Sequence, residues 1–230
     1  MSPQDAAKKA AAEAAAAYVK DGMTVGLGTG STVKFMVDEL GRRVREEGLQ
    51  IRGVPTSVAT QMQATDVGIP LIDLDEVIAF DVTIDGADEV DPQLDLIKGL
   101  GGALLREKIV ASLTKLQIIV VDPTKMVDKL GTRSPLPVEV LPFGVSVVKR
   151  KLEAMGLKPE LRMRAGEPVV TDNDNLVLDV YFADGIADAR QLELDLNNTP
   201  GVVENGLFLG MTQRVIIGDP EGGVREIARE

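Results

Sequence analysis

Short apolar runs alternate with longer helical stretches along the first half of this chain, and this alternation constrains its fold more than any other feature. Residues 23–28, "MTVGLG", are a short apolar run, and residues 31–48 carry apolar side chains at helical spacing. The alternation continues to residues 116–122, "LQIIVVD", which are apolar enough for a strand buried on both faces. This pattern predicts a doubly wound parallel sheet, with functional groups at the carboxyl ends of its strands.

The pattern changes after residue 130. From there the chain reads as a strand, a helix, two strands and a helix, before the strand "VVENGLFL" begins at Val202. This βαββαβ order is typical of a ferredoxin-like fold. Residues 213–230 then read as one more strand and helix of the first type. We therefore predict an α/β protein: a Rossmann-like doubly wound parallel sheet domain at 1–130 and 207–230, with an inserted ferredoxin-like α+β domain at 131–206.

Composition narrows the function. The net charge of −11 and an aromatic content of 3% argue against nucleic acid or an anionic membrane as a partner. No apolar run approaches the roughly 18 residues of a membrane span, and we expect a cytoplasmic protein. The chain has no histidine and no cysteine, which excludes the usual zinc and iron sites, cysteine nucleophiles and Ser-His-Asp triads. Proton chemistry must therefore use Asp, Glu, Lys or Tyr.

A glycine-rich segment, Gly26–Thr32 or "GLGTGST", lies between a predicted strand and a predicted helix. Glycines allow close approach of a ligand to the backbone, and a helix start offers N–H groups, so a phosphate or carboxylate is the expected guest. Ser31 and Thr32 add hydroxyl groups. The segment lacks the Gly-Lys-Ser/Thr of a nucleotide-binding P-loop, and Ser31 occupies the third glycine position of a dinucleotide fingerprint. The alternative is a tight turn with ordinary capping.

Four carboxylates follow another predicted strand in "DGADEVD": Asp85, Asp88, Glu89 and Asp91. A calcium loop is poorly supported, because Gly86 directly follows the first aspartate. The spacing of the three aspartates would suit magnesium, although the glycine makes a single helical face doubtful. The alternative is a solvated turn in an acidic protein.

A second glycine-rich segment, "IKGLGGALLREK" at residues 97–108, leads into a predicted helix and contains Lys98 and Glu107. Glu107 has uncharged neighbours one turn before and after it. They would raise its proton affinity if that face were partly buried. From spacing alone, a surface glutamate between Arg106 and Lys108 remains the simpler interpretation.

Taken together and in this order, four segments resemble ribose-5-phosphate isomerases of the A type: "GLGTGST", "IDGADEVD", "IKGLGGALLREK" and "DPTKMVDKLG". The resemblance covers nearly the whole chain and includes "SPLPVEVLPF" and "NTPGVVENGLF". One departure is Leu100, where many relatives carry glycine or a polar residue, and it concerns only the local shape of the loop.

The resemblance implies interconversion of ribose 5-phosphate and ribulose 5-phosphate in the pentose phosphate pathway, without metal or cofactor, in a homodimer or homotetramer. It implies that Glu107 moves a proton between C1 and C2 through a cis-enediolate, while Lys98 stabilises the developing oxyanion. Asp85 would serve the hydroxyl proton transfers, and Asp88 would help ring opening or substrate orientation, although these two roles could be exchanged. Glu89 and Asp91 would remain simple solvated turn residues. The implied substrate-binding residues are Thr29, Gly30, Ser31, Thr32, Asp85, Gly86, Ala87, Asp88, Lys98, Gly99, Leu100, Gly101 and Lys125.

The main alternative from another class is a non-catalytic sugar-phosphate sensor. Such a sensor would be expected to carry a DNA-binding or signalling module, and this chain shows neither a basic helix-turn-helix nor spare length. A metal-dependent phosphosugar enzyme built on the aspartates is a second alternative, which inactivation by a chelator would favour.

Overall fold

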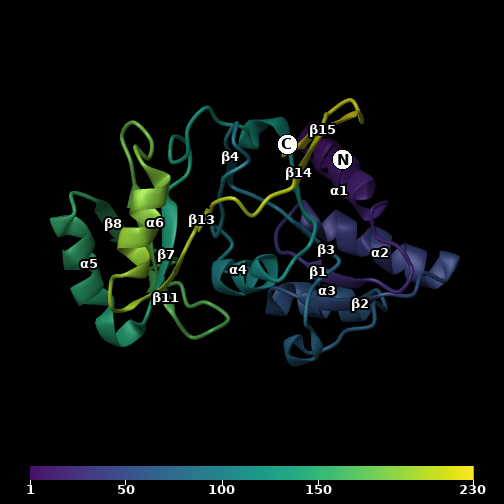
Figure 1. Cartoon of the computed structure of the whole chain (residues 1–230), viewed down its shortest axis with the longest axis horizontal. Coiled ribbons are helices and arrows are strands. Elements are labelled where there is room, and N and C mark those ends of the chain that lie inside the picture. Colours follow the sequence, from purple (N-terminus) through teal and green to yellow (C-terminus); the bar gives the residue numbers. More distant parts are fainter. Residues whose placement is uncertain (230) are drawn as a thin grey trace. The chain divides into compact units, whose positions relative to one another are not determined.

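The computed structural model describes residues 1–229, which form two compact units (Figure 1). Unit 1 consists of Met1–Ala87, Arg106–Met126 and the chain from Met211 onward, and unit 2 consists of Asp88–Leu105 and Val127–Gly210. Among the helices of these 229 described residues, none combines the length and apolar character needed to cross a bilayer.

Unit 1 is built on a six-stranded sheet with the strand order β15-β14-β6-β3-β1-β2. Five of the strands are parallel to their neighbours, and β15 pairs antiparallel with β14. The parallel α/β part of the predicted fold is therefore confirmed. The strands are β1 (Thr24–Leu27), β2 (Arg52–Pro55), β3 (Val82–Asp85), β6 (Gln117–Val121), β14 (Arg214–Gly218) and β15 (Val224–Ala228).

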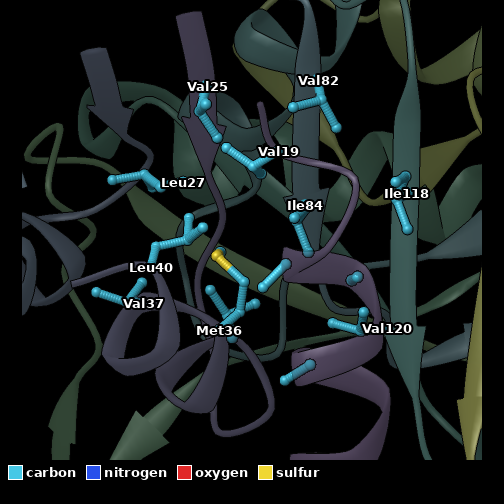
Figure 2. Close-up of a cluster of buried hydrophobic side chains, with 14 of the residues drawn as sticks. Val19, Val25, Leu27, Met36, Val37, Leu40, Val82, Ile84, Ile118 and Val120 are labelled. Atoms are coloured by element: carbon cyan, nitrogen blue, oxygen red, sulfur yellow. The ribbon is translucent and has the colours of Figure 1, made fainter. Parts of the chain in front are cut away.

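Three helices of unit 1 contribute to one apolar core: α1 (Pro3–Ala16), α2 (Val33–Glu47) and α3 (Val58–Asp66). Because side chains alternate along a strand, one face of the sheet presents Val25, Ile84 and Val120 to this core. Figure 2 shows these residues with Met36 and Leu40 of α2 among them. Gly218 of β14 permits very close packing against α1, because a Cβ there would lie only 1.8 Å from the Ala7 carbonyl oxygen.

The opposite face of the sheet is covered by α4 (Leu104–Ser112), whose Val110 packs with Val54 and Phe80. Close packing explains the glycine in the middle of β1. A Cβ on Gly26 would lie 2.6 Å from Cγ1 of Val110 and 2.1 Å from Oγ1 of Thr83. The sequence "VGLG" can therefore hold α4 directly against the strand that leads into the first glycine-rich loop.

The predicted C-terminal helix is wrong, because those residues form β15 instead. A turn closes the hairpin: the Asp219 N–H donates to the Gly223 carbonyl at 2.7 Å, and Gly222 adopts a φ of +90°. Asp, Pro and Gly favour such a turn, and β15 also pairs the backbone groups that β14 would expose at the edge of the sheet. Glu226 of β15 accepts a hydrogen bond from Tyr18 Oη at 2.7 Å and pairs with Arg214.

Unit 2 contains an antiparallel four-stranded sheet with the order β12-β7-β11-β8. Its apolar core includes Leu152 of α5 and Leu196 of α6. The elements in chain order are β7 (Leu136–Val140), α5 (Val145–Ala154), β8 (Lys158–Leu161), β11 (Leu176–Tyr181), α6 (Ala189–Asn197) and β12 (Val202–Asn205), with the short strands β9 (Met163–Arg164) and β10 (Glu167–Pro168) between β8 and β11.

A second sheet of unit 2 explains why residues 88–105 lie there and not with residues 1–87. Strands β4 (Glu89–Val90) and β5 (Leu96–Ile97) pair with each other, and β5 pairs with β13 (Leu207–Phe208). The predicted single strand "VVENGLFL" is therefore divided at Gly206: β12 joins the four-stranded sheet and β13 joins this one. Gly206 makes the division possible, because a Cβ there would lie 2.3 Å from the Lys98 carbonyl oxygen.

Candidate active site

In unit 1, the structure brings the first glycine-rich loop together with Asp85. Strands β1 and β3 are parallel neighbours, so the loop after Leu27 and the carboxylate that ends β3 meet at the same edge of the sheet. Asp85 is 1% exposed, and its Oδ1 accepts hydrogen bonds from the Thr29 N–H at 3.0 Å and the Gly86 N–H at 2.7 Å. A Cβ on Gly28 would lie 2.3 Å from that oxygen. Gly28 therefore lets the backbone and the carboxylate approach each other.

A cluster of hydroxyl groups fixes the same loop from the neighbouring strand. Oγ1 of Thr29 lies 2.8 Å from Oγ1 of Thr56 and 2.9 Å from Oγ of Ser57. Thr60 donates from Oγ1 to the Gly28 carbonyl at 2.8 Å, and Ser57 caps α3 by accepting the Thr60 N–H. Thr56, Ser57 and Thr60 were not predicted as site residues. The available signal was a run of hydroxyl residues directly after a predicted strand.

The remaining residues of the loop lead into α2. Gly30 has a φ of +123°, which favours glycine, and Ser31 is exposed. Thr32 is 8% exposed and precedes the first residue of α2, but its side chain makes no capping hydrogen bond. The first N–H groups of a helix lack partners within the helix and attract anions. The loop can therefore offer both backbone N–H groups and hydroxyls to a phosphate.

Two further predicted residues lie in unit 1. Glu107 is in the first turn of α4 and only 5% exposed, so the simple surface interpretation of this residue is wrong. Lys125 is half-buried at the end of η2 (Pro123–Lys125), a short 3-10 helix after β6. Asp122 caps η2 by accepting the Thr124 N–H at 2.9 Å. Burial raises the pKa of Asp122, but hydrogen bonds from Thr124 and Gln4 outweigh it and leave the pKa below its ordinary value.

In unit 2, the structure brings Asp88 together with the second glycine-rich loop. Oδ2 of Asp88 accepts the Leu100 N–H at 2.9 Å, and the Asp88 N–H donates to the Ile97 carbonyl at 2.9 Å. Lys98 is 2% exposed, and its Nζ lies 5.4 Å from the centre of the Phe208 ring. This distance permits a cation–π contact for a buried ammonium group.

The two other carboxylates of "DGADEVD" have structural tasks. Glu89 is fully buried, so its prediction as a solvated turn residue is wrong. Its carboxylate accepts three backbone N–H groups at 2.6 Å, those of Gly131, Arg133 and Ser134. Asp91 forms a local turn by accepting the N–H groups of residues 93 and 95 at 2.9 Å.

The predicted residues therefore fall into two groups. Unit 1 contains Thr29, Gly30, Ser31, Thr32, Asp85, Gly86, Ala87, Glu107 and Lys125, and unit 2 contains Asp88, Lys98, Gly99, Leu100 and Gly101. Within the 229 described residues, no three or more Asp, Glu, His or Cys side chains are grouped so as to hold a metal ion.

Sequence comparison identifies the family. Residues 52–222 match the family model for ribose 5-phosphate isomerase A, also called phosphoriboisomerase A. A ribose-5-phosphate isomerase A of Bifidobacterium adolescentis is 55% identical over 220 residues, which cover 95% of this chain and 94% of that protein.

Solved structures agree with the sequences. Ribose 5-phosphate isomerase A from Methanocaldococcus jannaschii is 44% identical, with a TM-score of 0.91 over 96% of this chain and 97% of that chain. A D-ribose-5-phosphate isomerase in complex with phospho-erythronic acid is 42% identical, with a TM-score of 0.92 over the same shares, 96% and 97%. Because the family model covers most of the chain and the relatives match nearly all of it, the chain belongs to the ribose 5-phosphate isomerase A family.

Proposed function

We propose that this chain interconverts D-ribose 5-phosphate and D-ribulose 5-phosphate, with Glu107 as the base that carries a proton between C1 and C2. The observation that carries the proposal is a buried glutamate in a histidine-free member of this family. Moving a carbonyl along a sugar requires one group that removes a carbon-bound proton and returns it to the neighbouring carbon. A positioned carboxylate can do so through a cis-enediolate, and general base catalysis of this kind contributes about 10²–10⁴ in rate.

The carboxylates of Asp85 and Asp88 are suited to the accompanying transfers at the hydroxyl groups. Each is held by backbone N–H groups, Asp85 by those of Thr29 and Gly86, and Asp88 by that of Leu100. Fixed carboxylates need little reorganisation during reaction. We assign the hydroxyl proton transfers to Asp85, and ring opening or substrate orientation to Asp88.

Lys98 is the proposed electrostatic partner of the enediolate. The ammonium group is almost fully buried, and charges interact more strongly away from water. The negative charge that develops on the substrate oxygen would be stabilised by this cation, which performs the task that a metal or an imidazole performs in other enzymes. We therefore expect the reaction to proceed without a metal or another cofactor.

The substrate phosphate is assigned to the first glycine-rich loop and to Lys125, since this loop offers backbone N–H groups and hydroxyls. The relative solved with phospho-erythronic acid supports a phosphorylated sugar chain as ligand. The further substrate contacts are proposed at Gly86, Ala87, Gly99, Leu100 and Gly101.

We also propose that the chain consists of a Rossmann-like domain and an inserted ferredoxin-like domain. The four strands β7, β8, β11 and β12 lie in the order β12-β7-β11-β8, which supports a ferredoxin-like domain within residues 131–206. The Rossmann-like assignment of the other domain rests on the parallel sheet with helices on both faces. A homodimer or homotetramer in the cytoplasm remains our expectation, which light scattering during size-exclusion chromatography and cell fractionation can test.

The function is tested by incubating chelator-treated protein with ribose 5-phosphate and following ribulose 5-phosphate, beside Glu107→Gln. We expect the parent to be active and the kcat of the variant to be lower by a factor of about 10²–10⁴. Glu153→Gln, which changes an exposed glutamate on α5, is the matched control and should keep parental activity.

Each other outcome has a defined meaning. A folded parent that binds the sugar phosphate but does not convert it would establish the sensor alternative. Loss of activity with chelator would indicate a metal-dependent enzyme. Equal activity of Glu107→Gln and the parent would keep the isomerase but assign the base to another residue, with Asp85 the next candidate.

A further inference from the structure

Arg162 and Asp179 form a largely buried ion pair in unit 2. Arg162 follows β8, and Asp179 lies on β11, the neighbouring strand. Nε of Arg162 donates to Oδ2 of Asp179 at 2.8 Å, and Nη2 donates to Oδ1 at 2.5 Å. The two side chains are 10% and 11% exposed. This two-point arrangement fixes the plane of the guanidinium group as well as its position.

The third nitrogen of the guanidinium reaches the second glycine-rich loop. Nη1 of Arg162 donates to the Gly99 carbonyl at 2.9 Å and to the Leu100 carbonyl at 3.1 Å. Both carbonyls belong to residues that directly follow Lys98. The guanidinium therefore connects the four-stranded sheet to the loop that carries the proposed cation.

The peptide bond between Gly99 and Leu100 is held on both sides. Its carbonyl accepts hydrogen bonds from Arg162 at 2.9 Å and from the Gly102 N–H at 3.0 Å, and its N–H donates to Oδ2 of Asp88 at 2.9 Å. Because a peptide bond is planar, the direction of the carbonyl also sets the direction of the N–H. The guanidinium and the Gly102 N–H together set this direction, and one rigid peptide group carries it to the Asp88 carboxylate.

The loop has one turn hydrogen bond of its own, from the Gly102 N–H to the Gly99 carbonyl, and further contacts outside the loop hold it. Gly99 has a φ of +107°, and glycines lose more conformational freedom on ordering than other residues. Before the glycines, the Lys98 N–H donates to the Gly206 carbonyl at 2.9 Å. After Gly99, the hydrogen bonds from Arg162 and to Asp88 hold the chain.

A role in stability alone would not explain the pair. A buried ion pair often contributes no more to stability than well-packed apolar residues of similar size. The ion pair also orients Nη1 of Arg162, which donates to the Gly99 and Leu100 carbonyls. We propose that Arg162, oriented by Asp179, is a positioning residue that sets the geometry of Asp88 and Lys98 for the isomerisation. This inference rests on the roles proposed above for those two residues.

The test compares Arg162→Ala and Arg162→Lys with Arg164→Ala, which changes an exposed arginine two residues away. We expect both Arg162 variants to lose about 10–100-fold in kcat, as misplaced catalytic groups do. The KM for ribose 5-phosphate should change less than kcat, because the proposed phosphate contacts lie in unit 1 and only the contacts proposed at Gly99 and Leu100 belong to the disturbed loop. Lysine keeps the charge but cannot bond the carboxylate and both carbonyls together. Added guanidinium should partly restore Arg162→Ala, and the control should match the parent.

A double-mutant cycle distinguishes positioning from independent damage. If Arg162 acts through Asp88, the kcat losses of Arg162→Ala and Asp88→Ala should be clearly less than multiplicative in the double variant. Fully multiplicative losses, or parental kcat in folded Arg162→Lys, would overturn the inference. If Arg162→Ala does not fold, Arg162→Lys decides by the same criterion, and Asp179→Asn, which weakens the ion pair, should also lose kcat.

The proposed function and this inference can fail separately. An inactive parent would refute the function, and active Asp88→Ala and Lys98→Ala variants would refute the assigned roles. If those proteins behave as proposed while the Arg162 variants match the parent, only the positioning role is refuted.

Discussion

Gly28 directly follows β1 and packs against Asp85, and its replacement by alanine should damage the site directly. The added Cβ would lie 2.3 Å from Oδ1 of Asp85, 2.4 Å from its Cγ and 2.6 Å from its Cα. These separations are roughly 1 Å short of ordinary van der Waals contact. Rotation of the carboxylate cannot relieve the contact with the Cα atom, so the strand and the loop must move apart.

Two magnitudes follow from this displacement. Overpacking of a rigid interior typically costs about 1–3 kcal/mol, which we expect as a lower free energy of unfolding. A displacement of about 1 Å at a reacting group can cost about 10²-fold in rate, so kcat should fall by about that factor. Urea unfolding gives the first quantity, and conversion of ribose 5-phosphate by the folded variant gives the second.

Gly223→Ala is the matched control in the same unit, because a Cβ there meets only the Cβ of Asp219 at 3.7 Å, an ordinary contact. It should keep parental activity. A Gly28→Ala protein with both parental kcat and parental stability would refute the reasoning. A variant that is destabilised but fully active would show that the close contact serves packing and has no part in the chemistry.

Two further predictions concern stability. Glu89→Ala removes the acceptor of three backbone N–H groups and should lower the free energy of unfolding, measured by urea titration, by about 3 kcal/mol or more. Glu89→Gln keeps one acceptor oxygen and should lower the free energy of unfolding less. Equal stability of Glu89→Ala and the parent would contradict this prediction. The pKa of Asp81 is lowered below its ordinary value of 3.8, mainly by the hydrogen bond from the Thr24 N–H and then by the Lys115 ammonium. The Asp81 carboxylate therefore stabilises the fold fully above pH 3.8, and this stabilisation is lost as the pH falls through the lower pKa of the folded state. Asp81→Asn should therefore flatten the acid side of the stability profile measured by thermal unfolding between pH 2 and 6, and parallel profiles would count against the assignment.

Much of the sheet and part of the site could be predicted from local sequence. Apolar runs such as residues 116–122 identify buried parallel strands, and parallel strands bring the loop after β1 to the carboxylate that ends β3. The C-terminal strand was missed because a short polar segment takes its structure from its neighbour. Val224–Ala228 pairs with an edge that only the folded sheet provides.

Other features depend on contacts between residues distant in sequence. Glu89 meets backbone groups 42 to 45 residues away, and Arg162 meets carbonyls 62 and 63 residues away. Every residue has a backbone carbonyl, and every residue except proline has a backbone N–H. Backbone partners of this kind therefore cannot be identified from residue types in the sequence. The burial of Glu107 is a similar case, since charged neighbours on both sides suggest an exposed position.

The two-segment composition of unit 2 limits how this protein could be recombined. A cassette cut at residues 131 and 206 would leave behind β4 and β5, together with Asp88 and Lys98. It would also separate the Glu89 carboxylate from the three N–H groups that it binds, and the guanidinium of Arg162 from its loop. Grafting between relatives must therefore transfer residues 88–105 and 127–210 together, because each segment contains the hydrogen-bond partners of the other.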